Sequence, residues 1–306
     1  CQWTGDPRVW SELAGGVMSL HVMTQTPSLL STLWRAWGTR HKPSGPVSSL
    51  GEVTWSMPSV VVDPSVVARY RDVCGFQTCH GVPMTYPQLL TFPLVMAYLS
   101  SPECPWPAVG TVHLANAIEQ REPLQAGDEV SVSMRTGALR AHEKGQVFDL
   151  RLTVTRDGQW IWRGTQSLLR RGVTPAAGDP YVSDWSDDHA LQRGLTFEAP
   201  RNIGRRYAPV SGDFNPMHWS EVGARLLGFR RMIAHGLWTQ ARALAGLLPS
   251  TPLHHATLKT EFKSPLLLPG HLAVWQARHA AQLRFEVRDA DDGRPHLRAV
   301  LTENPT

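Results

Sequence analysis

The sequence predicts an α+β fold built from two similar units, each an antiparallel sheet wrapped round one buried helix. First, each half of the chain contains one strongly apolar helical segment, residues 86–99 and 237–248, followed by four segments with strand character. Second, a segment rich in Pro, Gly and Asp, residues 172–188, separates the halves. A helix with so little polar surface has to be buried, and a sheet wrapped round it provides that burial.

In the first half, residues 1–49 show no sustained periodicity apart from a short helix expected over 29–37, and they are interpreted as an extension. A strand at 60–62 then precedes a helix that begins at Asp63-Pro64, because proline is favoured at the first helical position. The apolar helix over 86–99 follows. Four strands are expected after it, at 109–118, 129–136, 146–156 and 159–170.

The second half repeats this order. A short strand is expected at 196–199, and a lead-in segment at 203–210 comes before a short helix at 220–227. Four strands are expected after the apolar helix, at 256–262, 272–278, 281–288 and 296–302. Both halves carry a Pro-Leu…Gly turn after their first long strand. The predicted division of the chain is an extension (1–49), a first unit (50–172), a linker (173–193) and a second unit (194–306).

The composition narrows the class of protein. Charged residues make up 18% of the 306 residues, and the net charge of +4 is not gathered in runs of like charge. Nucleic-acid binding would call for a basic stripe or a recognised module, so we predict no nucleic-acid partner. No stretch approaches 18 consecutive apolar residues, so a membrane span is not expected either. The cytoplasm is the expected location.

Four cysteines occur, and none of them forms a Cys-x-x-Cys pair. The spacing of Cys74, Cys79 and His80 raises the alternative of a metal site, but no second pair of ligands follows at a spacing typical of zinc. We therefore expect free thiols in a reducing compartment and predict no metal. The remaining two cysteines are Cys1 and Cys104.

One stretch, residues 207–224 (YAPVSGDFNPMHWSEVGA), carries the residues suited to chemistry. Asp213 and His218 lie five residues apart, with Asn215-Pro216 between them. Proline lacks an N–H and displaces the preceding residue from helical geometry, so this segment is expected to be an ordered loop that directs both titratable groups to one place. Taken singly, Asp213 would be interpreted as a turn or cap residue and His218 as a hydrogen-bonded loop histidine. Together at this spacing they predict catalysis.

The same stretch resembles the signature of the MaoC-like (R)-specific enoyl-CoA hydratases, also called type 2 hydratases, and the later Ile233-Ala234-His235-Gly236 continues it. Residues 50–303 resemble the single-chain double-hotdog 3-hydroxyacyl-thioester dehydratases, whose first half carries segments like Thr85-Tyr86-Pro87 and Arg140-Ala141-His142. The resemblance implies a double hotdog fold. It also implies reversible hydration of trans-2-enoyl thioesters to (R)-3-hydroxyacyl thioesters, without a cofactor.

The resemblance assigns roles within this site. It implies that Asp213 and His218 hold the reacting water together and that Asn215 orients the water or the acid. Gly236 opens the apolar helix, where a free N–H lies at the positive end of the helix dipole, and the resemblance implies that this N–H binds the thioester carbonyl oxygen. His235 is expected to be structural and to bond the loop.

The first half lacks these groups. Residues 70–80 hold nothing like the acid–histidine loop, and Pro87, which has no N–H, aligns with Gly236. We therefore predict one site in the second half, with the first half as a non-catalytic partner that shapes the acyl pocket.

The thioester carrier, coenzyme A or acyl carrier protein, stays open at this point. Arg230, Arg231 and Lys263 are candidates for binding its phosphates, since arginine pairs well with phosphate, although ordinary surface cations would give the same pattern. Two other functions remain as alternatives: a non-catalytic acyl-thioester-binding or scaffold protein, and a hotdog thioesterase. The chain is expected to be a monomer with an internal pseudo-dimer or a homodimer.

Overall fold

The computed structural model describes residues 19–174, 176–183, 185, 190–249 and 251–304. The helices are α1 (Leu29–Gly38), α2 (Pro64–Cys74), α3 (Pro87–Ser100), α4 (Ile203–Ser211), α5 (Glu221–Leu226) and α6 (Gly236–Ala245), with short 3-10 turns η1 (Thr39–His41), η2 (Thr78–His80) and η3 (Pro216–His218). The strands are β1 (Ser19–Val22), β2 (Val53–Val61), β3 (Thr111–Gln120), β4 (Glu129–His142), β5 (Gly145–Arg156), β6 (Gln159–Arg171), β7 (Asp179–Pro180), β8 (Gln192–Ala199), β9 (Ala256–Phe262), β10 (Gly270–His279), β11 (Gln282–Asp289) and β12 (Pro295–Glu303).

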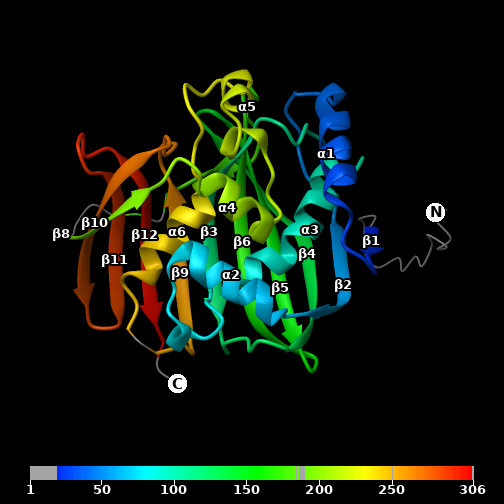
Figure 1. The fold of residues 1–306 in the computed structure, drawn as a ribbon. Coiled ribbons are helices and arrows are strands. Elements are labelled where there is room, and N and C mark those ends of the chain that lie inside the picture. Colours follow the sequence, from blue (N-terminus) through cyan, green and yellow to red (C-terminus); the bar gives the residue numbers. More distant parts are fainter. Residues whose placement is uncertain (1–18, 175, 184, 186–189, 250, 305–306) are drawn as a thin grey trace.

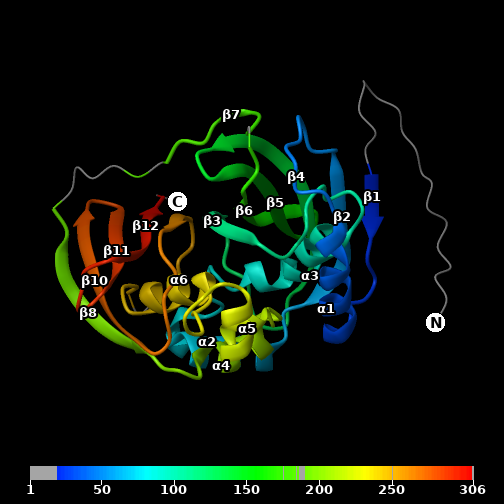
Figure 2. The same cartoon turned by 90° about the horizontal axis from the view of Figure 1, so that it is seen from above.

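The strands form one largely antiparallel sheet in the order β1-β2-β4-β5-β6-β3-β9-β12-β11-β10-β8, with β7 beside β4. The sheet curves round a layer that contains α2, α3, α4 and α6 (Figures 1 and 2). The run β2-β4-β5-β6-β3 corresponds strand for strand to β8-β10-β11-β12-β9. Each half is therefore the predicted unit, a sheet wrapped round one central helix.

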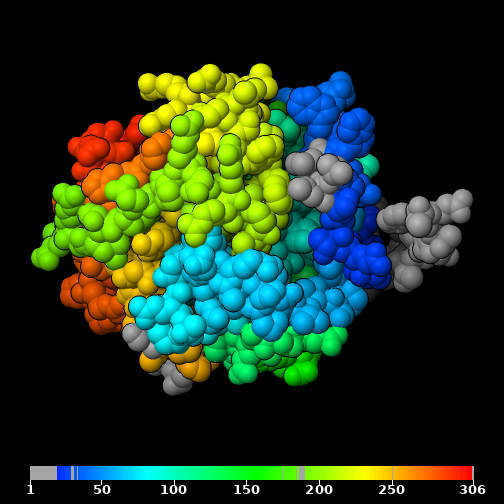
Figure 3. Space-filling view, in the orientation of Figure 1, coloured from blue at the N-terminus to red at the C-terminus, as the bar shows by residue number. Residues whose placement is uncertain are grey.

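The two units share one sheet and one core. They join where β3 pairs antiparallel with β9, for example at Asn116 opposite Thr260. Across the helix layer, Trp238 of α6 donates its Nε1–H to the Val73 carbonyl of α2, at 2.9 Å. Figure 3 shows the segment around α2 (cyan) and the segment from α4 to α5 (green-yellow to yellow) lying side by side on one face of the molecule. The two units are thus joined both through the sheet and through the helix layer.

One prediction of local structure was wrong, and one segment has a structure that the sequence did not predict; both contain proline. The first strand was expected only at 60–62, yet β2 begins at Val53 and carries Pro58 at a bulge between Met57 and Val60, where a strand tolerates proline. The lead-in segment at 203–210 is a helix, α4, despite the internal Pro209. This helix ends at Gly212, whose φ of +76° lies in the left-handed region that glycine adopts readily.

The predicted extension is part of the fold where the structure describes it. β1 pairs in parallel with β2, and Trp106 donates its Nε1–H to the Gly45 carbonyl at 2.8 Å. The predicted linker contains β7, and β8 begins at Gln192, two residues before the expected second unit. The division at residues 50, 173 and 194 stays a prediction, and Cys1 lies outside the described residues. No helix in the described ranges is long and apolar enough to cross a membrane.

Candidate active site

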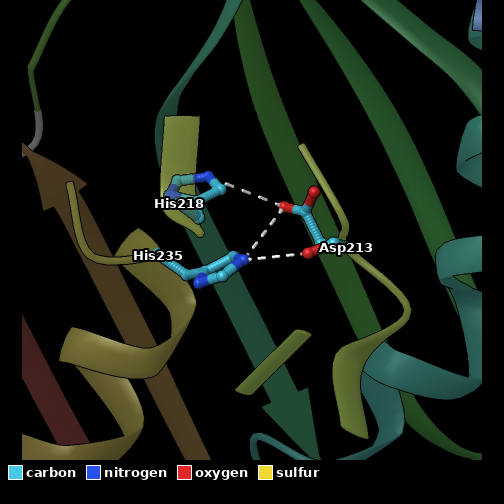
Figure 4. Close-up of side chains that lie close together, drawn as sticks. All are labelled: Asp213, His218 and His235. Carbon is cyan, nitrogen blue, oxygen red and sulfur yellow. Dashed lines mark hydrogen bonds and ion pairs between the residues drawn. The ribbon is translucent and has the colours of Figure 1, made fainter. Parts of the chain in front are cut away.

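Three elements of the second unit bring Asp213, His218 and His235 together (Figure 4). Asp213 follows the end of α4, His218 is the last residue of η3, and His235 is the N-cap of α6. The Asp213 Oδ2 atom lies 4.0 Å from His218 Nε2 and 3.9 Å from His235 Nε2. The loop therefore has the geometry that its proline predicts, with acid and histidine facing one space.

Hydrogen bonds within the loop hold the acid in place. The Asn215 main-chain N–H donates to Asp213 Oδ1 at 3.1 Å, and Ser211 Oγ accepts a hydrogen bond from the Asp213 N–H at 3.2 Å. Asn215 has φ −57° and ψ 124°, outside the helical region, as expected for a residue before proline. The structure thus shows Asn215 acting on Asp213 through its main chain.

Gly204 is a residue of this site that sequence reasoning missed. A Cβ atom on Gly204 would lie 1.8 Å from the His218 carbonyl oxygen, so only glycine lets α4 pack against the turn that carries His218. Glycine inside a helix costs about 1 kcal/mol relative to alanine and therefore signals a packing requirement. That signal becomes readable only once residues 203–210 are known to be helical.

His218 presents an unprotonated nitrogen to Asp213. Its Nδ1 lies 2.8 Å from the Ile233 carbonyl oxygen, which only accepts hydrogen bonds, so Nδ1 carries the hydrogen. Burial lowers the pKa of His218, against the opposing effects of the Asp213 carboxylate and the bond to Ile233, and keeps the ring neutral. The 4.0 Å gap from Nε2 to Asp213 Oδ2 is too long for a direct hydrogen bond. An oxygen atom at hydrogen-bond distance from both acceptors would lie to one side of the line that joins them.

His235 fixes the loop from the other side, as predicted. Its Nε2 donates a hydrogen bond to the Asp213 carbonyl oxygen at 3.0 Å. Its ring stacks on that of His218 with 3.7 Å between centroids. Burial, reinforced by the neighbouring His218, lowers the pKa of His235 to about 3 although Asp213 opposes this. Two neutral imidazoles stack here without repulsion between charges.

This burial predicts acid lability. Unfolded histidine takes up a proton near pH 6.5, whereas folded His235 does so only near pH 3, so the unfolded state binds more protons in between. The contribution of His235 to the free energy of unfolding is fully present above pH 6.5. It falls on acidification, by up to about 1.4 kcal/mol per pH unit. Urea unfolding at pH 7, 6 and 5 measures the slope. The His235→Gln variant is expected to show a shallower slope, and an equal slope in both proteins would contradict the assignment.

Gly236 is the first residue of α6, so its N–H has no partner within the helix. A Cβ atom on Gly236 would lie 2.9 Å from the ring of Phe262 at the end of β9, which adds a second reason for glycine at this position. In the first unit the corresponding helix α3 begins with Pro87, as the alignment of the halves predicted. The first unit therefore offers no N–H at the matching place.

Asp72 and His80, the acid and the histidine of segment 70–80 in the first half, have other partners than each other. Asp72 forms an exposed ion pair with Arg206 at 3.2 Å. His80 is buried, and its Nδ1 accepts a hydrogen bond from the Gln77 N–H at 3.0 Å. Cys74, Cys79 and Cys104 are free thiols.

Within the described ranges, one group of at least three histidine, cysteine or acidic side chains is close enough to hold a metal ion. It consists of Asp213, His218 and His235. The hydrogen on His235 Nε2 removes that atom from a ligand set. The arrangement favours a water oxygen between Asp213 and His218 over a metal ion.

A pocket of about 610 Å³ lies between β9 and the first unit with its linker, and Phe262 is among its lining residues. Lys263, one of the three predicted carrier-binding cations, lines this pocket, and Phe262 connects it to Gly236. The other two, Arg230 and Arg231, are exposed and are not among its lining residues. The described residues that line the pocket are Leu114, Ala141, His142, Glu143, Pro180, Tyr181, Ser183, Glu261, Phe262 and Lys263.

Comparison with known proteins points to one family. Residues 190–273 match the family described as MaoC like domain. The chain is 32% identical over 279 residues to 3-hydroxyacyl-thioester dehydratase X of Mycobacterium tuberculosis, which covers 91% of this chain and 99% of that protein.

Solved structures agree with the fold. The crystal structure of HtdX from Mycobacterium tuberculosis has a TM-score of 0.72 at 30% identity, over 82% of this chain and 100% of that one. A MaoC-like dehydratase from Phytophthora capsici has a TM-score of 0.69 at 15% identity, over 87% and 96% of the two chains. A Mycobacterium tuberculosis protein described as having a double hotdog fold has a TM-score of 0.54 at 15% identity, over 85% and 98%.

Proposed function

The chain belongs to the MaoC-like dehydratase family, and from this premise we propose that it is a hydro-lyase that interconverts trans-2-enoyl thioesters and (R)-3-hydroxyacyl thioesters. One observation supports this best: the Asp213 carboxylate and the unprotonated His218 Nε2 face each other across 4.0 Å. Two acceptors at that separation suit a water molecule that donates one hydrogen to each. The same space suits the 3-hydroxyl group of the product.

In the hydration direction, the oxygen of this water forms a bond to C3 of the enoyl chain. One water proton passes to the Asp213–His218 pair, and the pair delivers a proton to C2, so that H and OH add across the double bond. Negative charge develops meanwhile on the thioester oxygen. The Gly236 N–H at the start of α6 donates to that oxygen, where the helix dipole also favours negative charge. Dehydration runs the same steps in reverse.

For the carrier, we propose that its arm lies in the pocket beside Phe262 and that Lys263 pairs with a phosphate of the carrier. The Lys263 Nζ atom lies 3.3 Å from Glu261 Oε2, in an exposed ion pair. On binding the carrier, Lys263 would exchange this ion pair for one with the phosphate. We propose that Arg230 and Arg231, which lie outside the pocket lining, contact the same phosphate-bearing carrier from the surface.

One chain is proposed to be the functional unit, because the β3–β9 pairing joins both sheets internally. A homodimer of such chains is compatible with this. The cytoplasm is the proposed location, in keeping with the free thiols of Cys74, Cys79 and Cys104.

The test is hydration of enoyl-CoA substrates from C4 to C16, followed as loss of the enone absorbance, with chiral analysis of the product. We expect loss of the enone band and formation of the (R)-3-hydroxyacyl thioester at one or more chain lengths. Release of free thiol, detected with a chromogenic disulfide, would identify a thioesterase instead. Tight binding without loss of the enone band would identify a non-catalytic acyl-binding protein.

A further inference from the structure

One titratable side chain of the first unit reaches the proposed site: His113, near the start of β3. Its ring centroid lies 4.9 Å from that of Phe262, the residue that packs on Gly236 and lines the pocket. Its Nε2 atom is shielded from solvent and has no hydrogen-bond partner among the residues that the structure describes. Because an unsatisfied buried polar atom is costly, this position calls for an explanation.

A β-bulge turns His113 towards the helices. The pairing of β3 with β6 shifts register between His113 and Ala115, so Leu114 is an extra residue. In a regular strand His113 and Asn116 would lie on opposite faces, whereas one extra residue places them on the same face. That face packs on the helix layer, since Asn116 accepts a hydrogen bond from Gln88 of α3. Bulges often re-aim a side chain beside an active site.

The protonation state of His113 follows from its surroundings. Burial lowers the pKa of His113 to about 4, while a hydrogen bond to the Ala115 main chain and the charge of Asp213 oppose this. The ring is therefore neutral near pH 7. We assign the ring hydrogen to Nδ1, on the side of the Ala115 main chain, because Nε2 has no partner. Nε2 is then an acceptor.

We propose that His113 Nε2 accepts a hydrogen bond from the amide N–H of the carrier arm that lies nearest the thioester sulfur. This inference rests on the proposed function and adds a binding residue supplied by the first unit. With the thioester oxygen at Gly236, the arm leaves past Phe262 into the pocket, and His113 contacts the same ring. An amide N–H that leaves water needs an acceptor, and coenzyme A and acyl carrier protein share this amide.

The experiment uses two small substrates of equal length. One is the crotonyl thioester of N-acetylcysteamine, which keeps this amide. The other is the S-(4-oxopentyl) thioester, in which a methylene replaces the N–H. We expect the wild-type protein to prefer the amide substrate by about 10-fold in kcat/KM, in keeping with one buried donor left unpaired in the analogue. The His113→Leu variant is expected to lose that preference, through a loss of about 10-fold on the amide substrate alone.

Two further variants sharpen the test. His113→Gln keeps a carbonyl acceptor and is expected to retain a preference for the amide substrate, and His254→Leu, at an exposed histidine, serves as the matched control without effect. No amide preference in the wild-type protein, or equal losses on both substrates in a folded His113→Leu variant, would overturn the inference while hydration itself persists. Absence of hydration of every enoyl-CoA in the wild-type protein would instead overturn the proposed function.

Discussion

Replacing Asp213 by asparagine, or His218 by alanine, is expected to reduce kcat for crotonyl-CoA hydration by about 10²–10⁴-fold, the usual contribution of a positioned acid–base group. The asparagine side chain would keep the shape of the aspartate but could not take a proton from the bridging oxygen. The alanine would remove the acceptor that lies 4.0 Å from Asp213 Oδ2. Because the two groups act on one oxygen, we expect the double variant to lose little more than either single variant.

Matched variants in the first unit provide the control. Asp72→Asn removes a carboxylate that pairs with Arg206 on the surface, and His80→Asn alters a histidine bonded to the Gln77 main chain. Both are expected to keep most of the wild-type kcat. A folded first-unit variant with a loss as deep as that of Asp213→Asn would refute the prediction of one site. Retention of most activity in Asp213→Asn or His218→Ala would refute the dehydratase assignment.

The Gly236→Pro variant is expected to have a kcat about 10²–10³-fold lower than that of Gly236→Ala. Proline removes the N–H that is proposed to bind the thioester oxygen, whereas alanine keeps it. The backbone accepts proline here. Position 236 is the first of its helix, and His235 before it is already extended, with φ −66° and ψ 133°. In the first unit α3 also begins with a proline, Pro87, although the residue before it, Tyr86, is helical with φ −67° and ψ −40°.

Gly236→Ala is the necessary comparison. It keeps the N–H but adds a Cβ atom where the Phe262 ring lies 2.9 Å away, so it reports the steric cost alone. Thermal unfolding of both variants separates loss of fold from loss of turnover. If the proline and alanine variants have the same kcat, the Gly236 N–H is not the oxyanion donor.

Much of the fold was readable from the sequence because hydrophobic periodicity is a local property. The apolar segment expected at 86–99 is α3 (Pro87–Ser100), and the strand expected at 256–262 is β9 with the same bounds. The sequence was insufficient where tertiary contacts override a local signal. Pro58 is tolerated at a bulge of β2, and Pro209 lies inside α4. In both places packing outweighs the local preference against proline.

The sequence by itself determined the pairing of Asp213 with His218, because Pro216 breaks the segment between them and only five positions separate them. It also placed Gly236 at the opening of the buried helix. Only the tertiary structure decided which nitrogen of His218 faces the acid, since that depends on the Ile233 carbonyl fifteen residues away.

The reach of His113 towards this site was also beyond the sequence. It depends on a register shift between β3 and β6, and on β9 of the other unit, which brings Phe262 to its ring. Contacts of this kind join residues far apart in the chain, so no local pattern records them. The proposed catalytic pair is local to one loop, whereas the protonation state of His218 and the neighbouring side chains come from the packing of both units.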